Sequence, residues 1–249
     1  MITPTSSFTY FALLTIAYFV LRYLIVDKYE NKGNSALGIA MSIVYLGIMF
    51  ILQLSANMSN AKERCGGTPQ MWPALVYTIV PNILIFGLLM LLLMMFPGWK
   101  APFSNTLGYL LISSPMLGVR NIFNNILVKK SNNKLLNMVY RDPSLMINEM
   151  TPENFDIFIS KMGDAKHPIL NANYRQHLPS LYNMVVLKDR ISEFVWYLLT
   201  GALVISNSNS YIQTFKCNRT AGELSNKLDK ALSKNSKKEK PKQKWKLAY

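Results

Sequence analysis

The sequence predicts an all-α membrane protein with four transmembrane helices, the third kinked at Pro81, plus an interfacial amphipathic helix and a small polar helical domain. Half of its 249 residues are apolar and only 16% are charged, which is typical of a polytopic membrane protein and unusual for a soluble domain. Three long apolar runs end at turn-forming residues, and the basic residues concentrate in the C-terminal tail. We therefore divide the chain into a membrane domain at 1–130, a polar domain at 131–190, a fourth span at 191–212 and a basic tail at 213–249.

The first two apolar runs are residues 8–26 and 36–54. Each contains 19 residues, close to the ~20 that cross a bilayer as a helix. Arg22, near the end of the first run, can extend its guanidinium to the membrane interface. No basic stretch precedes this run and no small-residue cleavage site follows it, so we expect an uncleaved signal anchor.

The third run, 73–96, organises the chain. Its 24 residues carry no charge. At about 1.5 Å per residue a helix of this length extends about 36 Å, which exceeds a hydrocarbon core of ~30 Å. Trp72 precedes the run, and Trp99 and Lys100 follow it after a Pro-Gly break. We predict that these three residues lie at the membrane interface, where Trp and Lys are favoured.

Pro81 lies inside the third run. Because proline has no N–H and its ring crowds the preceding turn, it predicts a kink. Asn82 beside it needs a hydrogen-bond partner within the hydrocarbon. We therefore expect the third helix to pack against other helices.

After the third run, apolar residues recur at helical spacing with polar residues between them, over about 106–130. We interpret this segment as an amphipathic helix lying in the membrane interface. A core helix of a small soluble domain is the alternative interpretation.

Residues 131–190 form the predicted polar domain. Thr151-Pro152-Glu153 is typical of a helix start, and Gly163 of a helix end. Four residues mark the apolar face of this helix: Phe155, Phe158, Ile159 and Met162.

A charged group lies around the start of the fourth span: Lys188, Asp189, Arg190 and Glu193. It indicates a helix flank at the level of the lipid headgroups. Residues 191–212 follow as the fourth span, although only about 15 residues from Ile191 form its apolar part.

The tail is strongly basic. After Asn207 the chain carries eleven Lys and Arg residues against three acidic ones. Such a segment favours polyanions, so its expected partner is anionic lipid, nucleic acid or an acidic protein.

Several short strings resemble a family of multi-pass internal-membrane proteins of nucleocytoplasmic large DNA viruses, the giant viruses of algae and amoebae. They are Cys65-Gly66-Gly67, Pro69, Ala74, Thr78, Pro81, Ile85-Phe86-Gly87, Phe96-Pro97-Gly98-Trp99, Pro102-Phe103-Ser104-Asn105-Thr106 and Gly108-Tyr109. The resemblance covers residues 57–125 and, more loosely, 210–224. Family members usually carry an aromatic residue where Asn82 stands here. The resemblance implies a multi-pass component of the virion's internal membrane or of a host ER-derived membrane.

The sequence offers no pattern typical of catalysis. It has no glycine-rich phosphate loop, no nucleophile elbow and no His/Cys metal cluster, so we expect no enzyme activity, cofactor, metal or small-molecule substrate. A membrane-embedded transporter or enzyme of unknown substrate is the alternative. Two or more buried ionisable groups facing a common cavity would favour that alternative.

Cys65 and Cys217 are the only cysteines. Four spans would place both on one side of the membrane, where they can pair as a disulfide; two free thiols are the alternative. The sequons at Asn57 and Asn218 are possible glycosylation sites and favour a luminal face. The basic tail favours a cytoplasmic one, so the sequence leaves the orientation open.

From these residues and the resemblance we expect a structural or assembly protein. It would link the bilayer, its first partner, to capsid or minor capsid proteins, or to core components through the basic tail.

Overall fold

The computed structural model describes residues 4–27, 36–115, 117–128, 134–163 and 169–217, with a few positions between 225 and 233. The predictions for Asn218 and for most of the tail lie outside these residues. Within them the protein is helical, without a strand. A single β-bridge joins Leu127 to Leu170.

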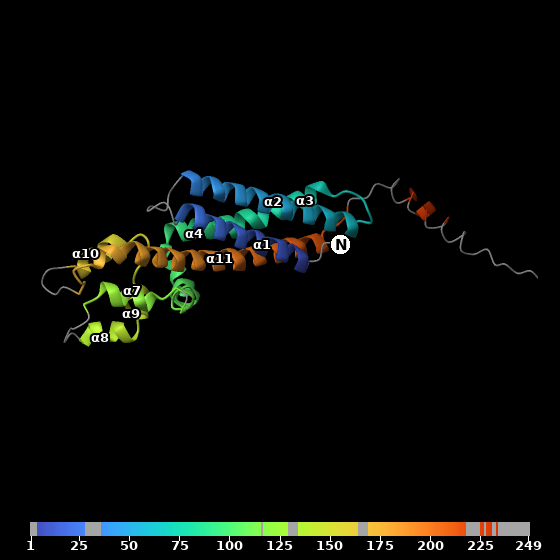
Figure 1. Ribbon diagram of the computed structural model, residues 1–249. Coiled ribbons are helices and arrows are strands. Elements are labelled where there is room, and N and C mark those ends of the chain that lie inside the picture. The colour runs from blue at the N-terminus through green and yellow to red at the C-terminus, as the bar shows by residue number, and fades with distance from the viewer. Residues whose placement is uncertain are drawn as a thin grey trace, which may run out of the picture.

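Long helices lie side by side and form a bundle (Figure 1). They are α1 (Pro4–Arg22, continued by a π-helical turn Tyr23–Asp27), α2 (Ala36–Arg64), α3 (Met71–Pro81), α4 (Leu88–Met95) and α11 (Leu178–Thr214). α1 runs towards the end of the bundle that carries the small domain, which we call the domain end. α2 runs back to the opposite end, the distal end, where the N-terminus also lies (Figure 1).

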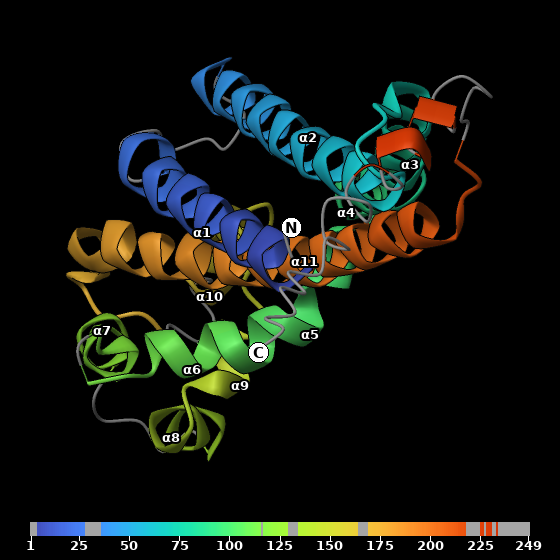
Figure 2. The same cartoon turned by 90° about the vertical axis from the view of Figure 1, so that its right-hand side faces the viewer.

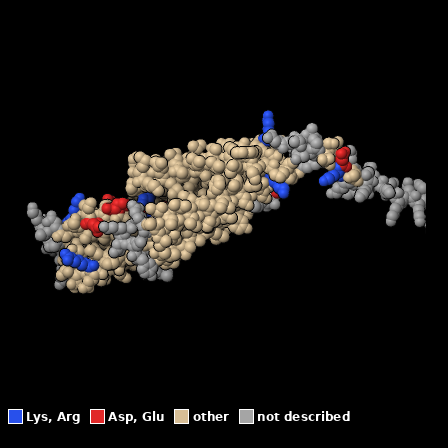
Figure 3. Space-filling model, turned by 90° about the horizontal axis from the view of Figure 1, so that it is seen from above, with Lys and Arg blue, Asp and Glu red and all other residues tan. Residues whose placement is uncertain are grey.

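Three of these helical stretches are long and apolar enough to cross a membrane: Ser6–Asp27, Ala36–Arg64 and Met71–Met95. The prediction of three apolar helices is thereby confirmed. Their outward faces carry large apolar side chains, such as Ile43 (64% exposed) and Met94 (74% exposed). In water an apolar surface of this extent is rare, whereas hydrocarbon covers it without cost. Figure 3 shows the same belt as a broad region without Lys, Arg, Asp or Glu, with charged side chains towards both ends.

The helix geometry changes at Pro81, where we predicted a kink. α3 ends there and continues as a π-helical segment, Asn82–Gly87, before α4 begins. Because proline has no N–H, one backbone hydrogen bond of the helix is missing, and a π-turn accommodates this loss. The Asn82 side-chain amide donates to the Thr78 carbonyl and to Gln53 Oε1 of α2, both at 2.8 Å. The Asn82 amide nitrogen thus has a partner on a neighbouring helix, as its position in the apolar run requires.

α11 extends through both halves of the molecule (Figure 1). Its 37 residues correspond to about 55 Å of helix. The first part belongs to the small domain, and the second part lies against α1, α2 and α3. Gly201 of the second part allows a close approach, because a Cβ there would lie 2.0 Å from Phe11 Cζ of α1.

The predicted interfacial helix at 106–130 is wrong as a single element. The chain forms α5 (Ala101–Phe103), a π-helical turn (Ser104–Gly108) and α6 (Tyr109–Ile112), and begins α7 (Val119–Ile126) only after a turn. Gly118 adopts φ +65°, a left-handed conformation that glycine allows at this turn.

The two parts of this segment have different surroundings. α5 and α6 run crosswise to α11: Figure 1 views them along their axis and Figure 2 from the side. They expose Leu107, Leu110 and Leu111. α7 instead buries Val119, Phe123 and Ile126 in the domain core, so the alternative interpretation, a core helix, is correct for α7.

The small domain therefore begins before residue 131, because its core draws on α6 and α7. The other elements are α8 (Lys134–Arg141), α9 (Ser144–Ile147), α10 (Phe155–Met162), a 3-10 turn (Tyr174–His177) and the start of α11. The core includes Ile112, Phe123, Ile126, Leu136, Val139, Ile147, Met150, Leu181 and Val185.

The predicted helix in this domain is present as α10. It buries Phe155, Ile159 and Met162. The backbone N–H groups of Thr151 and Asn154 each donate to the other residue's side chain, which caps the preceding turn.

Candidate functional site

Charged side chains gather where α11 passes from the domain into the bundle. We call them the ionic cluster: Arg22, Asp27, Lys100, Asp189, Arg190 and Glu193. Two come from the end of α1, one from the 3-10 turn Pro97–Lys100 after α4, and three from α11. The cluster thus joins three segments that are distant in sequence.

Arg190 is the centre of this cluster. Its Nε lies 2.8 Å from Asp27 Oδ2 and its second terminal nitrogen 3.2 Å from Asp27 Oδ1, a two-pronged contact. Its other terminal nitrogen donates to Glu193, which lies 4.0 Å from Arg22. The Asp27 side chain is only 2% exposed. Burial of this kind makes each charge depend on its partner.

Lys100 forms the second pair of the cluster. Its Nζ lies 2.6 Å from Asp189 Oδ2 and 3.9 Å from the more exposed Glu153. Burial raises the pKa of the Asp189 carboxyl, and the nearby Lys100 ammonium opposes that rise. Lys100 was predicted to lie at the membrane interface, and that placement stays a prediction. The structure adds that its ammonium is paired and that its side chain is 12% exposed.

The two predicted interface tryptophans lie at opposite ends of the third span. Trp72 is 75% exposed at the distal end, and Trp99 is half exposed at the domain end. The Trp99 carbonyl accepts a hydrogen bond of 3.0 Å from Trp196 Nε1 of α11. The turn after α4 is therefore fixed to α11 by the backbone of Trp99 as well as by the Lys100 side chain.

Lys188 is buried beside the cluster, with 2% of its surface exposed. Its Nζ donates to the Ile147 carbonyl at 2.7 Å and to Asn105 Oδ1 at 3.2 Å. Burial lowers the pKa of this ammonium to about 8. Gly108 makes room for it, because a Cβ there would lie 2.7 Å from the Lys188 carbonyl oxygen.

Sequence reasoning found these α11 charges but not their partners. It interpreted Lys188, Asp189, Arg190 and Glu193 as a helix flank open to headgroups. The positions of Asp27 and Lys100 in the sequence could have indicated these partners, because each residue follows the end of an apolar run. In the bundle, α1 and α4 both end at the domain end, where α11 carries its charged residues.

A disulfide lies at the distal end. Cys65 and Cys217 are joined, with their Cα atoms 5.6 Å apart. Arg64 reinforces this connection by donating to the Ile212 carbonyl at 3.1 Å and lying 5.6 Å from the centre of the Phe215 ring. The turn between α2 and α3 is thus tied to the end of α11.

Asn57 is buried in the bundle rather than available to a glycan. Its side-chain nitrogen donates to Thr78 Oγ1 at 2.7 Å and to Ser208 Oγ at 2.6 Å. Glycosylation at Asn57 is therefore a wrong prediction, since the nitrogen that would carry the sugar is enclosed between three helices. The helix α2 extends past the predicted end at residue 54 because polar residues such as Asn57 find partners there.

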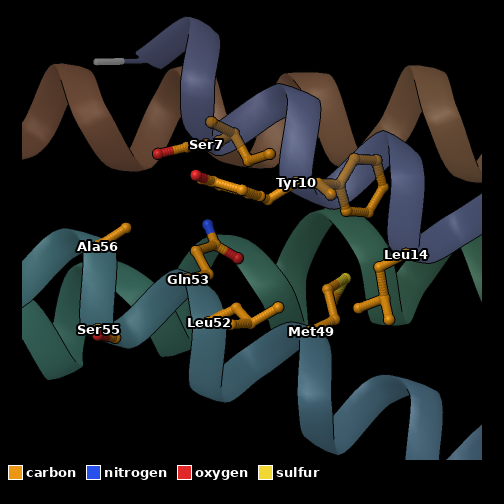
Figure 4. A pocket seen from close by; sticks show the side chains of 10 residues that line it. Ser7, Tyr10, Leu14, Met49, Leu52, Gln53, Ser55 and Ala56 are labelled. Carbon is orange, nitrogen blue, oxygen red and sulfur yellow. The ribbon is translucent and has the colours of Figure 1, made fainter. Parts of the chain in front are cut away.

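Two crevices bear on the alternative of a transporter or an enzyme, which requires two or more ionisable groups at a common cavity. One lies between α1 and α2 (Figure 4) and is lined by Ser7, Tyr10, Phe11, Leu14, Met49, Leu52, Gln53, Ser55, Ala56 and Ile205. The other lies beside α6 and α7, and Arg120 is the only Lys, Arg, His, Asp or Glu in its lining. Neither brings two such groups to a common cavity. Among the described residues, no group of three or more His, Cys, Asp or Glu could hold a metal ion.

These features define the class as a helical membrane protein with a small domain fixed to one end of its bundle. Comparisons with family models, with characterised proteins and with solved structures found no match.

Proposed function

We propose that this chain is a structural or assembly protein of a viral internal membrane, which links the bilayer to the capsid shell or to core components. The ionic cluster is the observation that supports the linking role. It fixes the domain to the bundle through Arg190, Asp27 and Lys100, so that force on the domain is transmitted to the membrane helices. The assignment to a viral membrane rests on the sequence resemblance.

The proposal includes a fourth span, residues 191–212 of α11. This part of α11 turns Tyr197, Gly201, Val204, Ser208 and Ile212 towards the bundle and buries them. Its polar residues do not prevent insertion, because Ser208 is satisfied by Asn57 and by the Tyr77 carbonyl. With four spans the N-terminus and the tail share the distal side, and the small domain lies on the other.

The orientation follows from the disulfide. Disulfides persist in oxidising compartments, so we place the distal end in the lumen of an ER-derived membrane and the small domain in the cytosol. Seven of the eleven basic residues after Asn207 carry little weight against this, because orientation depends on those within about 15–20 residues of the span ends. Most of the tail lies farther away.

The partners follow from this arrangement. The small domain offers a cytosolic surface for capsid or minor capsid proteins. Its surface exposes apolar side chains that include Ile157 (60% exposed), Leu145 (50% exposed) and Met138 (47% exposed). Phe155 and Met162, on the predicted apolar face of α10, are buried in the domain core, and Phe158 packs against that core. The basic tail would meet anionic lipid, nucleic acid or an acidic protein on the other side.

Fractionation of purified virions tests the proposal. The chain should leave the particle with the detergent-soluble membrane layer, and cross-linking beforehand should join residues 134–163 to a shell protein. Ile157→Asp should reduce that cross-linking, whereas Lys161→Asp on the same helix is the matched control. Absence of the chain from the membrane layer, or cross-links only to lipid, would leave no linking role.

Deletion of 234–249 tests the tail separately. Membrane insertion should persist while incorporation into particles falls. The attachment of the tail should also weaken steeply as salt increases, because binding to a polyanion releases counterions. Full incorporation of the truncated chain would remove the tail from the proposal.

A further inference from the structure

We infer that the crevice between α1 and α2 is a binding site for one acyl chain of a glycerophospholipid, with the ester carbonyl of that chain at its polar end. This inference concerns the bilayer alone and holds with or without a capsid partner. Below, the site is called the acyl crevice.

The acyl crevice has apolar walls and an exposed mouth. Phe11, Leu14, Met49 and Ile205 supply apolar wall from three helices. Tyr10 (62% exposed) and Leu52 (47% exposed) stand at the mouth. Both belong to helices that are long and apolar enough to cross a membrane. The mouth therefore opens on hydrocarbon, where acyl chains are the surrounding solvent.

The size of the acyl crevice fits a chain and excludes a helix. Its volume is about 140 Å³. Because an apolar cavity of about 150 Å³ holds a group the size of benzene, the crevice admits a short segment of one acyl chain, roughly six carbon atoms. A helix with its side chains is about 10 Å wide and needs a groove rather than this narrow space. An unfilled crevice would also lose the dispersion contacts of its lining atoms.

A hydrogen-bond donor without a partner lies at this site. Gln53 Oε1 accepts from the Asn82 amide, whose orientation is fixed because it also donates to the Thr78 carbonyl. Gln53 must therefore direct its amide nitrogen elsewhere. That nitrogen is buried and has no hydrogen-bond partner in the described part of the chain. Figure 4 shows it directed across the crevice towards the side chains of Ser7 and Tyr10.

The position of this donor selects the chemistry of the ligand. A donor enclosed in hydrocarbon destabilises the structure unless it finds an acceptor. Ser7 and Tyr10 lie in the first two turns of α1, near the distal boundary of the apolar belt. Ester carbonyls of phospholipids lie at this boundary and are acceptors without an N–H or O–H of their own. The ester carbonyl of a chain in the acyl crevice thus meets Gln53, and the Tyr10 hydroxyl can donate to it as well.

Photo-labelling of the full chain tests the inference. The protein is reconstituted in phosphatidylcholine vesicles that contain a small fraction of phosphatidylcholine with a diazirine near the end of one acyl chain. Labelled residues are then mapped by mass spectrometry. We expect labels to concentrate on residues that line the acyl crevice, such as Leu14 and Met49. Uniform labelling around the apolar belt would overturn the inference.

Two variants make this measurement specific. Ser7→Phe fills the acyl crevice and should remove most of the label. Gly47→Phe is the matched control, because Gly47 faces outward on α2 and nothing lies within 4 Å of a Cβ there. Formation of the Cys65–Cys217 disulfide and an unchanged melting temperature show that each variant is folded. Equal labelling of the two variants, or cross-links between two chains at the crevice in place of lipid labels, would contradict an acyl ligand.

A second measurement addresses the carbonyl without relying on a crevice-filling variant. Wild-type protein should label about two- to tenfold more with an ester-linked probe than with an ether-linked one, the range expected for one hydrogen bond. Gln53→Leu should reduce this preference, and Gln53→Leu combined with Tyr10→Phe should abolish it, while the label stays in place. Equal labelling of the wild type by both probes would remove the carbonyl from the inference.

Discussion

Arg190 offers a direct test of the ionic cluster. Arg190→Met removes the guanidinium and keeps most of the apolar stem. In the native protein this guanidinium contacts Asp27 at 2.8 and 3.2 Å and also pairs with Glu193. The substitution leaves Asp27 without this partner and Glu193 with only Arg22, 4.0 Å away.

The expected loss of stability is large. The side chains of Arg190 and Asp27 are 15% and 2% exposed, so water replaces little of the lost interaction. Removing one member of a buried ion pair leaves an uncompensated charge and costs about 3–5 kcal/mol. An exposed pair would contribute about 0–1 kcal/mol. The two ranges do not overlap, so the measured loss distinguishes a buried joint from a hydrated helix flank.

A double variant separates this effect from a loss of packing. Asp27→Asn with Arg190→Met removes both charges of the pair, so it should be less destabilised than the sum of the two single variants. Arg120→Met is the matched control. Arg120 is exposed in the small domain and donates one hydrogen bond of 3.3 Å to the Arg141 carbonyl. Its replacement should therefore change the stability by less than about 0.5 kcal/mol.

The assay is equilibrium unfolding in mixed detergent micelles, followed by tryptophan fluorescence. Trp99 and Trp196 lie next to the ionic cluster and report on its opening. Additive losses in the double variant would refute the reasoning, as would a loss in Arg190→Met no greater than that of the control.

Three further perturbations address other parts of the molecule. Replacing Cys65 and Cys217 together by Ser should lower stability by up to about 5 kcal/mol in the chain-entropy model, since the bond closes a separation of 152 residues; equal melting with and without reductant would contradict this. Burial in the folded protein lowers the pKa of Lys188 to about 8. The charged form of Lys188 therefore destabilises the folded state. The stability of the wild type should therefore rise from about pH 8 towards the pKa of its unfolded form, an increase that Lys188→Met should remove. Gly201→Ala should destabilise by about 1–3 kcal/mol through overpacking against Phe11, and a smaller side chain at Phe11 should recover part of the loss in the same unfolding assay.

The sequence alone predicts a helix, or the end of a helix, where it depends only on the residues of that one segment. The third span follows from an uncharged run longer than the hydrocarbon core, and its change of geometry follows from Pro81. The end of α10 at Gly163 is likewise a local signal. Bilayer thickness and backbone chemistry act on each segment independently of the rest of the chain, and so such features can be predicted without knowing what the segment contacts.

The tertiary structure decided which residues meet. Asp27 and Arg190 are 163 positions apart, and nothing in their immediate sequence distinguishes a buried pair from two solvated charges. The same holds for Asn57. Its neighbours in sequence make it part of a sequon, but in the structure it donates hydrogen bonds to α3 and α11. The turn at Gly118 likewise directs the apolar face of α7 to the domain core instead of the membrane interface. Burial sets the free energy of each of these groups, and burial depends on which distant segments the fold brings to its side.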